Sequence, residues 1–108
     1  MVKQLLKQIP LMQDSYDRFL RTLSNKTRLI IINSLREKPK NVTQLTNELG
    51  IHQTSVSHAL KRLLDCGFVI VERNGKERFY ELNNETIEPL LKLMETHIGK
   101  YCKDCEVK

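Results

Sequence analysis

Residues 41–68, NVTQLTNELGIHQTSVSHALKRLLDCGF, constrain the fold more than any other stretch, because they carry two short amphipathic segments with a glycine between them. Thr43 can cap a first short helix, which ends at Gly50, where glycine readily adopts the left-handed conformation. After three intervening residues, Thr54 can cap a second helix, which ends at Gly67. Two short helices joined by a tight turn that contains glycine predict a helix-turn-helix.

The second of these helices has two chemically different faces. Its inner face is apolar and carries Val56, Leu60, Leu63 and Leu64. Its outer face is polar and carries Thr54, Ser57, His58 and Lys61, with Ser55 and Arg62 at its flanks. Small groups that reach base edges, followed by cations that hold phosphates, suit a helix that inserts into the major groove of DNA. On an isolated helix, the same face would also fit plain exposure to solvent.

A β-hairpin is predicted immediately after the helix-turn-helix. Residues 68–73 and 77–82 are rich in β-branched and aromatic residues, and they flank Asn74-Gly75. This dipeptide is the strongest short hairpin signal, because both turn positions need a positive φ. Near the tip lie three cations, Arg73, Lys76 and Arg78. A basic hairpin after such a helix favours a winged helix-turn-helix domain that binds double-stranded DNA.

Further helices are expected on both sides of this unit. Residues 11–23 place their apolar side chains on one helical stripe. Leu5, Leu6 and Ile9 either extend this helix or form a turn before it, with Pro10 marking the junction. A second, densely apolar helix can start after Ser24 as its N-cap and end before Pro39.

A last helix with an apolar face can begin after Asn83 or Asn84. The predicted order is therefore α-α-α-α-β-β-α, mainly α with a β-hairpin wing. Residues 1–10 are expected to form an N-terminal arm, residues 11–100 the DNA-binding and dimerisation domain, and residues 101–108 a C-terminal tail that contains cysteines.

The first and last helices carry more apolar surface than a chain of 108 residues can cover by itself, which favours a homodimer. The predicted interface residues are Phe19, Leu23, Leu90, Leu91 and Met94. The alternative is that these side chains only complete the core of the monomer.

The charge distribution is uneven. The net charge is +5, and residues 1–40 carry nine Lys and Arg against three Asp and Glu. This balance suggests a polyanionic partner, although a solvated basic surface fits the count equally well. No apolar run approaches the length of a membrane span and no signal peptide is evident, so we expect a cytoplasmic protein without a membrane partner. No nucleophile–base pair, phosphate-binding glycine loop or paired carboxylates indicate an enzyme.

Three stretches together resemble the ArsR/SmtB family of small dimeric winged-helix repressors: LSNKTRLIIINSL, the helix-turn-helix, and RNGKERFYEL. The family's opening motif is matched by Leu23 to Arg28, its recognition helix is approached by Thr54 to Leu60, and the end of its wing is matched by Tyr80 to Leu82. The resemblance covers roughly residues 15–100. It implies a homodimer that represses transcription by binding a palindromic operator.

The resemblance also implies which residues contact DNA. On the recognition helix they are Gln53, Thr54, Ser57 and His58, and on the wing they are Lys76 or Arg78. The helix faces described above add Ser55 at the flank, and Lys61 and Arg62 as phosphate contacts.

Members of this family release DNA when a metal ion, a metalloid or an oxidised thiol state occupies a sensing site. One of the family's two usual metal positions corresponds to Val42 to Leu45, which contain no thiol and no carboxylate. The other corresponds to Asn84, Thr86, His97 and Lys100. Of these four, only His97 can bind zinc, so both usual sites are expected to be lost.

Cys102 and Cys105 remain as candidates for a sensor. Two thiolates at this spacing can chelate a soft metal or metalloid ion, form a disulfide, or attack one. No other cofactor is predicted, and the alternative is a tail with two incidental cysteines. The third cysteine, Cys66, is expected to be a small core residue.

The sequence therefore predicts a sequence-specific DNA-binding transcriptional regulator, a homodimeric repressor that senses soft metal, metalloid or thiol redox state through Cys102 and Cys105. Two alternatives stay open at this point. One is a constitutive DNA-binding regulator with no small-molecule inducer, and the other is a winged-helix module that serves protein interaction.

Overall fold

The computed structural model describes the backbone of residues 2–102 and the side chains of residues 13–102. The elements follow one another in the predicted order: α1 (Val2–Leu23), α2 (Lys26–Leu35), α3 (Val42–Leu49), α4 (Gln53–Asp65), β1 (Val69–Asn74), β2 (Glu77–Leu82) and α5 (Ile87–Tyr101). The two strands pair antiparallel, with Val69 opposite Leu82 and Asn74 opposite Glu77. The predicted winged helix-turn-helix is therefore the observed arrangement.

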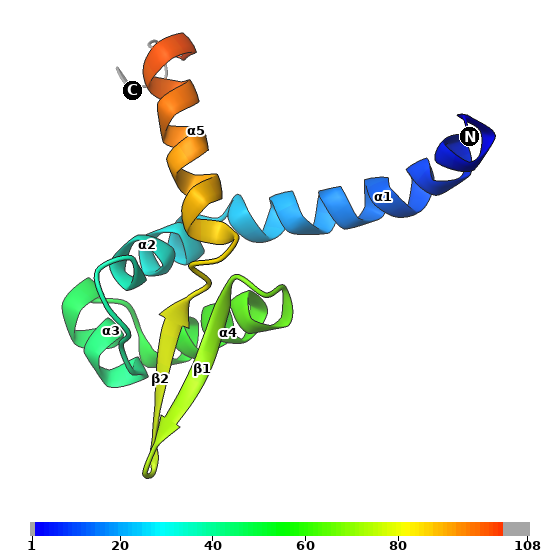
Figure 1. Cartoon of the computed structure of the whole chain (residues 1–108). Helices are drawn as coiled ribbons and strands as arrows, with labels where there is room; N and C mark the ends of the chain where they lie inside the picture. The colour runs from blue at the N-terminus through cyan, green and yellow to red at the C-terminus, as the bar shows by residue number, and fades with distance from the viewer. Residues whose placement is uncertain (1, 103–108) are drawn as a thin grey trace.

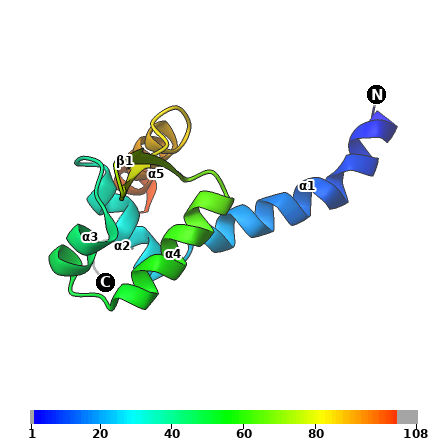
Figure 2. The same cartoon turned by 90° about the horizontal axis from the view of Figure 1, so that it is seen from below.

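The molecule consists of a packed body and two projecting helices (Figure 1). The body contains α2, α3, α4 and the base of the hairpin, while α1 and α5 leave it in different directions. The view from below also shows α1 projecting away from the body (Figure 2). The radius of gyration is 16.3 Å, whereas a compact chain of this length would have about 13 Å. The two helices predicted to dimerise are thus the ones that the body covers least.

The core is built around the inner face of α4. Val56, Leu60 and Leu63 are completely or almost completely buried. They are joined in one cluster by apolar side chains of α2, α3 and the hairpin base, among them Ile31, Ile32, Leu35, Leu45, Phe68, Val69 and Leu82. Because these contacts fix the rotation of α4 about its own axis, they also fix which of its residues face the solvent.

Four helices begin at caps other than the predicted ones. The N-cap of α2 is Asn25 rather than Ser24, and its Oδ1 atom accepts a hydrogen bond from the backbone N–H of Arg28 at 3.0 Å. The N-cap of α3 is Asn41 rather than Thr43, because Asn41 and Gln44 form a reciprocal capping box. A capping box satisfies two backbone N–H groups together. Thr43 could not form one, because the residue three positions after it is Thr46 and not Glu or Gln.

Helix α4 begins two residues earlier than predicted, with His52 as its N-cap in place of Thr54. Its Nδ1 atom accepts a hydrogen bond from the backbone N–H of Thr54 at 3.2 Å. The last helix has Thr86 at its N-cap position without a side-chain bond, while Asn83 instead accepts from the N–H of Glu85 at 3.1 Å. Histidine is not among the usual capping residues, which explains why the sequence predicted Thr54 and not His52 as the cap of α4.

The junction predicted at Pro10 is wrong, because α1 runs without interruption from Val2 to Leu23. Proline removes one backbone hydrogen bond from a helix. The apolar periodicity of the sequence continues on both sides of Pro10 and outweighs that loss. Residues 2–10 are therefore helical and continuous with the rest of α1.

The hairpin turn also differs from the prediction. Asn74 pairs with Glu77, so the two turn residues are Gly75 and Lys76. Only Gly75 has a positive φ, of 70°, and no other residue type has one in the described part of the chain. A turn that needs a positive φ only at its first position is of the II′ kind, which favours glycine there. As a result Arg73 lies opposite Arg78.

Replacing Leu60 with alanine should lower the free energy of unfolding by about 2–5 kcal/mol, because it leaves a cavity at the centre of the core. The matched change at its exposed neighbour, Lys61→Ala, should stay within about 0.5 kcal/mol of the wild type. Urea unfolding at one fixed protein concentration measures both values. Equal effects of the two substitutions would contradict the assignment of the inner face of α4.

Candidate nucleic-acid interface

The outer face of α4 is open to solvent, as the sequence predicts. Six of the seven candidate residues on this helix are exposed: Gln53, Thr54, Ser55, Ser57, His58 and Lys61. The buried residues of the same helix, Val56, Ala59, Leu60 and Leu63, lie on the opposite side. The N-terminal half of this face therefore presents hydroxyl, amide and imidazole groups, and a lysine follows them one turn later.

Arg62 is placed differently from the other candidates, because it is half-buried. Its Nε atom donates a 3.0 Å hydrogen bond to the hydroxyl of Thr22, which is completely buried on α1. The Thr22 hydroxyl in turn donates to the carbonyl oxygen of Arg18 at 2.8 Å and lies 3.3 Å from Cys66 Sγ. Arg62 thus ties α4 to α1, a role that its position at the flank of the helix did not reveal.

Cys66 is half-buried and forms the C-cap of α4. Because the Thr22 hydroxyl gives its proton to Arg18, the thiol is the donor in the contact between Cys66 and Thr22. The residue therefore joins the packing between α1 and α4, as a small residue at the edge of the core.

The tip of the hairpin is basic, and its strand register adds one residue that the predicted site lacks. Lys76 and Arg78 are exposed. Arg73 is exposed as well and lies directly across from Arg78, on the hairpin face that carries Tyr80 and Leu82 at its base. The alternation along the strands could have identified Arg73, but only with the correct turn. Two like charges directly opposite each other destabilise a hairpin slightly, so this pair favours an anion between them.

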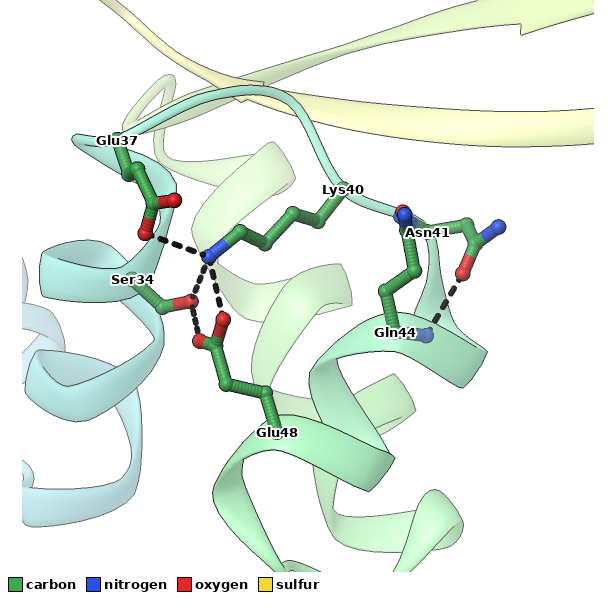
Figure 3. A network of polar contacts seen from close by, with 6 residues as sticks. All are labelled: Ser34, Glu37, Lys40, Asn41, Gln44 and Glu48. Carbon is green, nitrogen blue, oxygen red and sulfur yellow. Dashed lines mark hydrogen bonds and ion pairs between the residues drawn. The ribbon is translucent and has the colours of Figure 1, made fainter.

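Lys40 connects the helix-turn-helix to the wing (Figure 3). Its backbone pairs with Tyr80 of β2 through two hydrogen bonds, of 3.0 and 2.8 Å. Its side chain is only 2% exposed, and the Nζ atom donates to Ser34 Oγ of α2 at 2.8 Å and to Glu48 Oε1 of α3 at 2.7 Å. Ser34 also donates to Glu48, and Glu37 Oε2 lies 3.4 Å from Nζ. One residue thereby holds α2, α3 and β2 in a fixed relation.

The charges in this network stabilise each other. Burial lowers the pKa of the Lys40 ammonium, but the hydrogen bond and the charge of Glu48 outweigh it, so the pKa is raised above its usual value. The hydrogen bonds from Lys40 and Ser34 lower the pKa of the Glu48 carboxyl. Both groups therefore remain charged at neutral pH, which is the condition for a buried lysine in a small domain.

The predicted dimer-interface residues divide into two groups. Leu23 and Leu91 are buried within one protomer, and Phe19, Leu90 and Met94 are half-buried against the same core. Phe19 packs on Phe68 with ring centroids 4.8 Å apart. Among the described side chains of the two projecting helices, the exposed apolar ones are different residues, namely Tyr16, Leu20, Leu93, Ile98 and Tyr101. A single helical stripe in the sequence could not show which part of it the body already covers.

The candidate sensor residues are described only in part. Cys102 is half-buried and is the C-cap of α5, whereas Cys105 lies outside the described residues. His97 is exposed, with its ring centroid 4.9 Å from that of Tyr101. In the part of the chain that the structure describes, no three His, Cys, Asp or Glu side chains gather as a metal site, and no helix is long and apolar enough to cross a membrane.

Known proteins are similar to this chain over most of its length. A model of the family described as bacterial regulatory protein, arsR family, matches residues 25–71. The HTH-type transcriptional regulator NmtR of Mycobacterium tuberculosis is 36% identical over 72 residues, which are 67% of this chain and 60% of NmtR. The arsenical resistance operon repressor of Bacillus subtilis is 32% identical over 77 residues, which are 70% of this chain and 73% of that repressor.

Solved structures agree with the fold. The homodimeric winged helix-turn-helix DNA-binding domain of a possible ArsR-family regulator from Mycobacterium bovis, solved by NMR, matches with a TM-score of 0.78. The match covers 87% of each chain at 23% sequence identity, and it confirms the predicted fold class. The chain spans less than two thirds of the length of several relatives that it matches, 60% in the case of NmtR.

The Lys40 network should make stability depend on acid. Because the pKa of Glu48 is lowered in the folded state, its contribution is complete above the usual glutamate pKa of about 4.3 and is lost as the pH falls through the lowered value. The variant Lys40→Met removes the largest cause of this lowered pKa, the hydrogen bond and charge of Lys40. The free energy of unfolding should therefore differ most between wild type and variant above about pH 5, and this difference should shrink as the pH falls towards about 3.

The charge-matched control is Lys26→Met, at an exposed lysine in the first turn of α2. Urea unfolding of both variants across this pH range gives the comparison. A difference between wild type and Lys40→Met that stays constant with pH would refute the assigned ion pair.

Proposed function

The chain belongs to the arsR family of bacterial regulatory proteins, and from this premise we propose that it is a homodimeric transcriptional repressor that binds a palindromic operator in double-stranded DNA. The observation that carries the proposal is the outer face of α4, where six adjacent polar or basic residues are exposed while the opposite face is buried. In this proposal α4 is the recognition helix, and the hairpin is the wing that contacts the flanking DNA.

The chemistry of the two elements assigns different tasks to them. The small groups at the N-terminal end of α4, such as Ser57 and His58, can approach base edges in the major groove, and Lys61 can reach a phosphate. The exposed Arg73 and Arg78 face each other across the wing and can hold a phosphate between them, which would also relieve their repulsion. Arg62 is a weaker candidate for a DNA contact, since its Nε atom already binds Thr22.

The homodimer is supported by the surface of the projecting helices. On α1, Tyr16 and Leu20 are 61% and 55% exposed, and on α5, Leu93 and Tyr101 are 69% and 74% exposed. Apolar surface of this extent on helices that leave the body is typical of an association site. A second copy that covers it would bring two α4 helices to one duplex, which matches the two half-sites of a palindrome.

The proposed function is tested by selection from a randomised duplex library with the purified protein. We expect a palindrome whose half-sites are separated by about one helical turn. A footprint on DNA next to the chain's own gene then identifies a natural copy. Selection of no sequence, or binding that disappears at moderate salt for every duplex, would rule out a specific operator and favour the protein-interaction module.

Substitutions on the two elements should have separable effects. Ser57→Ala and His58→Ala should cost about 1–3 kcal/mol on the selected palindrome and relax its sequence preference, because they remove base contacts. Arg78→Ala should weaken binding to all sequences alike and reduce the slope of log affinity against log salt by about 1. Fluorescence anisotropy with selected and scrambled duplexes measures both. If Arg78→Ala changed the preferred sequence, or if Ser57→Ala left it intact, the division of tasks would be wrong.

We also propose that Cys102 and Cys105 regulate DNA binding by taking up a soft metal or metalloid ion or by forming a disulfide. Support comes from the Cys-x-x-Cys spacing and from the name of the Bacillus subtilis relative, an arsenical resistance operon repressor. The position of Cys102 at the end of α5 would connect this chemistry to a helix of the proposed dimer.

The double variant Cys102→Ser/Cys105→Ser should bind DNA like the wild type but should no longer be released by As(III), Cd(II) or a mild oxidant. The matched control is Cys66→Ser, in which the hydroxyl can still bind Thr22 and the response should persist. Anisotropy before and after each agent measures release. An unchanged response of the double variant would favour a different sensor, and no response of the wild type would favour a constitutive regulator.

A further inference from the structure

A single guanidinium group connects α2 to the first three turns of α5. Arg36, the C-cap of α2, donates from Nε and Nη2 to the two carboxylate oxygens of Glu88, at 3.0 and 2.9 Å. The same group donates from Nη1 and Nη2 to the two oxygens of Glu95, at 2.7 and 3.1 Å. Arg36 thus bridges two carboxylates that lie seven residues apart, on the same side of α5.

Outside this cluster, which we call the Arg36 clamp (Arg36, Glu88 and Glu95), α5 has few attachments to the body. Ile87 and Leu91 are its buried residues in the described part of the chain, and they lie in its first two turns. Leu90 and Met94 pack against the core only in part. The C-terminal part of α5 projects away from the body (Figure 1). Its side chains Ile98 and Tyr101 are exposed.

A helix that is held by one short apolar stripe can tilt about that stripe, because apolar contacts are not directional. Two bidentate ion pairs have a defined geometry, since the planar guanidinium must face both carboxylates. Glu88 and Glu95 are separated along α5 by about 10 Å, the rise of seven helical residues. Contacts at both points therefore fix the tilt of α5 relative to α2, and α2 packs directly on α4 in the core.

We propose that Arg36 is a positioning residue that sets the half-site spacing which the dimer recognises. The inference rests on the proposed function, in which α5 takes part in the contact between protomers and each α4 reads one half-site. A change in the tilt of α5 then changes the separation and orientation of the two recognition helices. Arg36 acts through Glu88 and Glu95 and does not need to touch DNA.

The test compares spacing preference with overall affinity. The probes are the palindrome selected by the wild type and two derivatives, with one base pair inserted or removed at the centre. Each derivative rotates one half-site by roughly 34° relative to the other. The wild type should prefer the selected spacing by about tenfold, because the duplex must be deformed to restore the register. Arg36→Gln should reduce this preference to about twofold, with a smaller change in affinity for an isolated half-site.

The matched control is Arg21→Gln. Arg21 also forms an ion pair, with Asp17 on the same exposed surface of α1 at 2.8 Å, so its loss changes the net charge equally. This variant should keep the spacing preference of the wild type. The pair Glu88→Gln/Glu95→Gln leaves Arg36 in place and should reproduce the loss, and combining it with Arg36→Gln should add nothing. Circular dichroism checks that each variant is folded, and the carboxylate pair serves as the test if Arg36→Gln fails to fold.

The outcomes separate the two proposals. If the wild type selects no palindrome, the proposed function fails and this inference fails with it. If the wild type shows a spacing preference and both clamp variants retain it, even with weaker binding to all three duplexes, the clamp has only a structural role and the inference is refuted. A loss of preference in both clamp variants, but not in Arg21→Gln, establishes Arg36 as the positioning residue.

Discussion

The burial of one face of α4 is the constraint on which the rest of the structure depends. Val56, Leu60 and Leu63 are enclosed by α2, α3 and the base of the hairpin. Because the buried face of α4 is fixed, the polar residues on the opposite face of the helix are held towards solvent. The same packing that stabilises the domain thus presents the polar surface that, in the proposed function, meets DNA.

Charged residues fix the relative orientation of elements that apolar packing alone does not fix. The almost fully buried Lys40 joins α2 and α3 to β2. Arg62 connects α4 to α1, and Arg36 connects α2 to α5. Each of these contacts is directional, so each fixes an angle or a register that a small core does not fix by itself. The charged groups therefore form two sets. One set orients the helices and the hairpin, and the other, on α4 and the wing tip, is exposed and in the proposed function contacts DNA.

The sequence was sufficient for the order of the elements, the inner face of α4 and most of its outer face, because hydrophobic periodicity and the stop at Gly50 are local signals. The sequence was insufficient where adjacent residues could each serve as the N-cap of a helix, and where a contact joins segments that are distant in the chain. Adjacent capping candidates such as Ser24 and Asn25 differ only in the bonds that each completes. The roles of Lys40 and Arg62 depend on partners that only tertiary structure brings together, and the wing register depended on the single residue Gly75.

Backbone amide chemical shifts, recorded by NMR while the selected duplex is added, test the central claim most directly. We expect the largest changes on the exposed face of α4, residues 53–61, and on the wing tip, residues 73–78, with small changes at the buried positions of α2. Changes concentrated on α2, α3 or the far end of α1, with α4 unaffected, would contradict it.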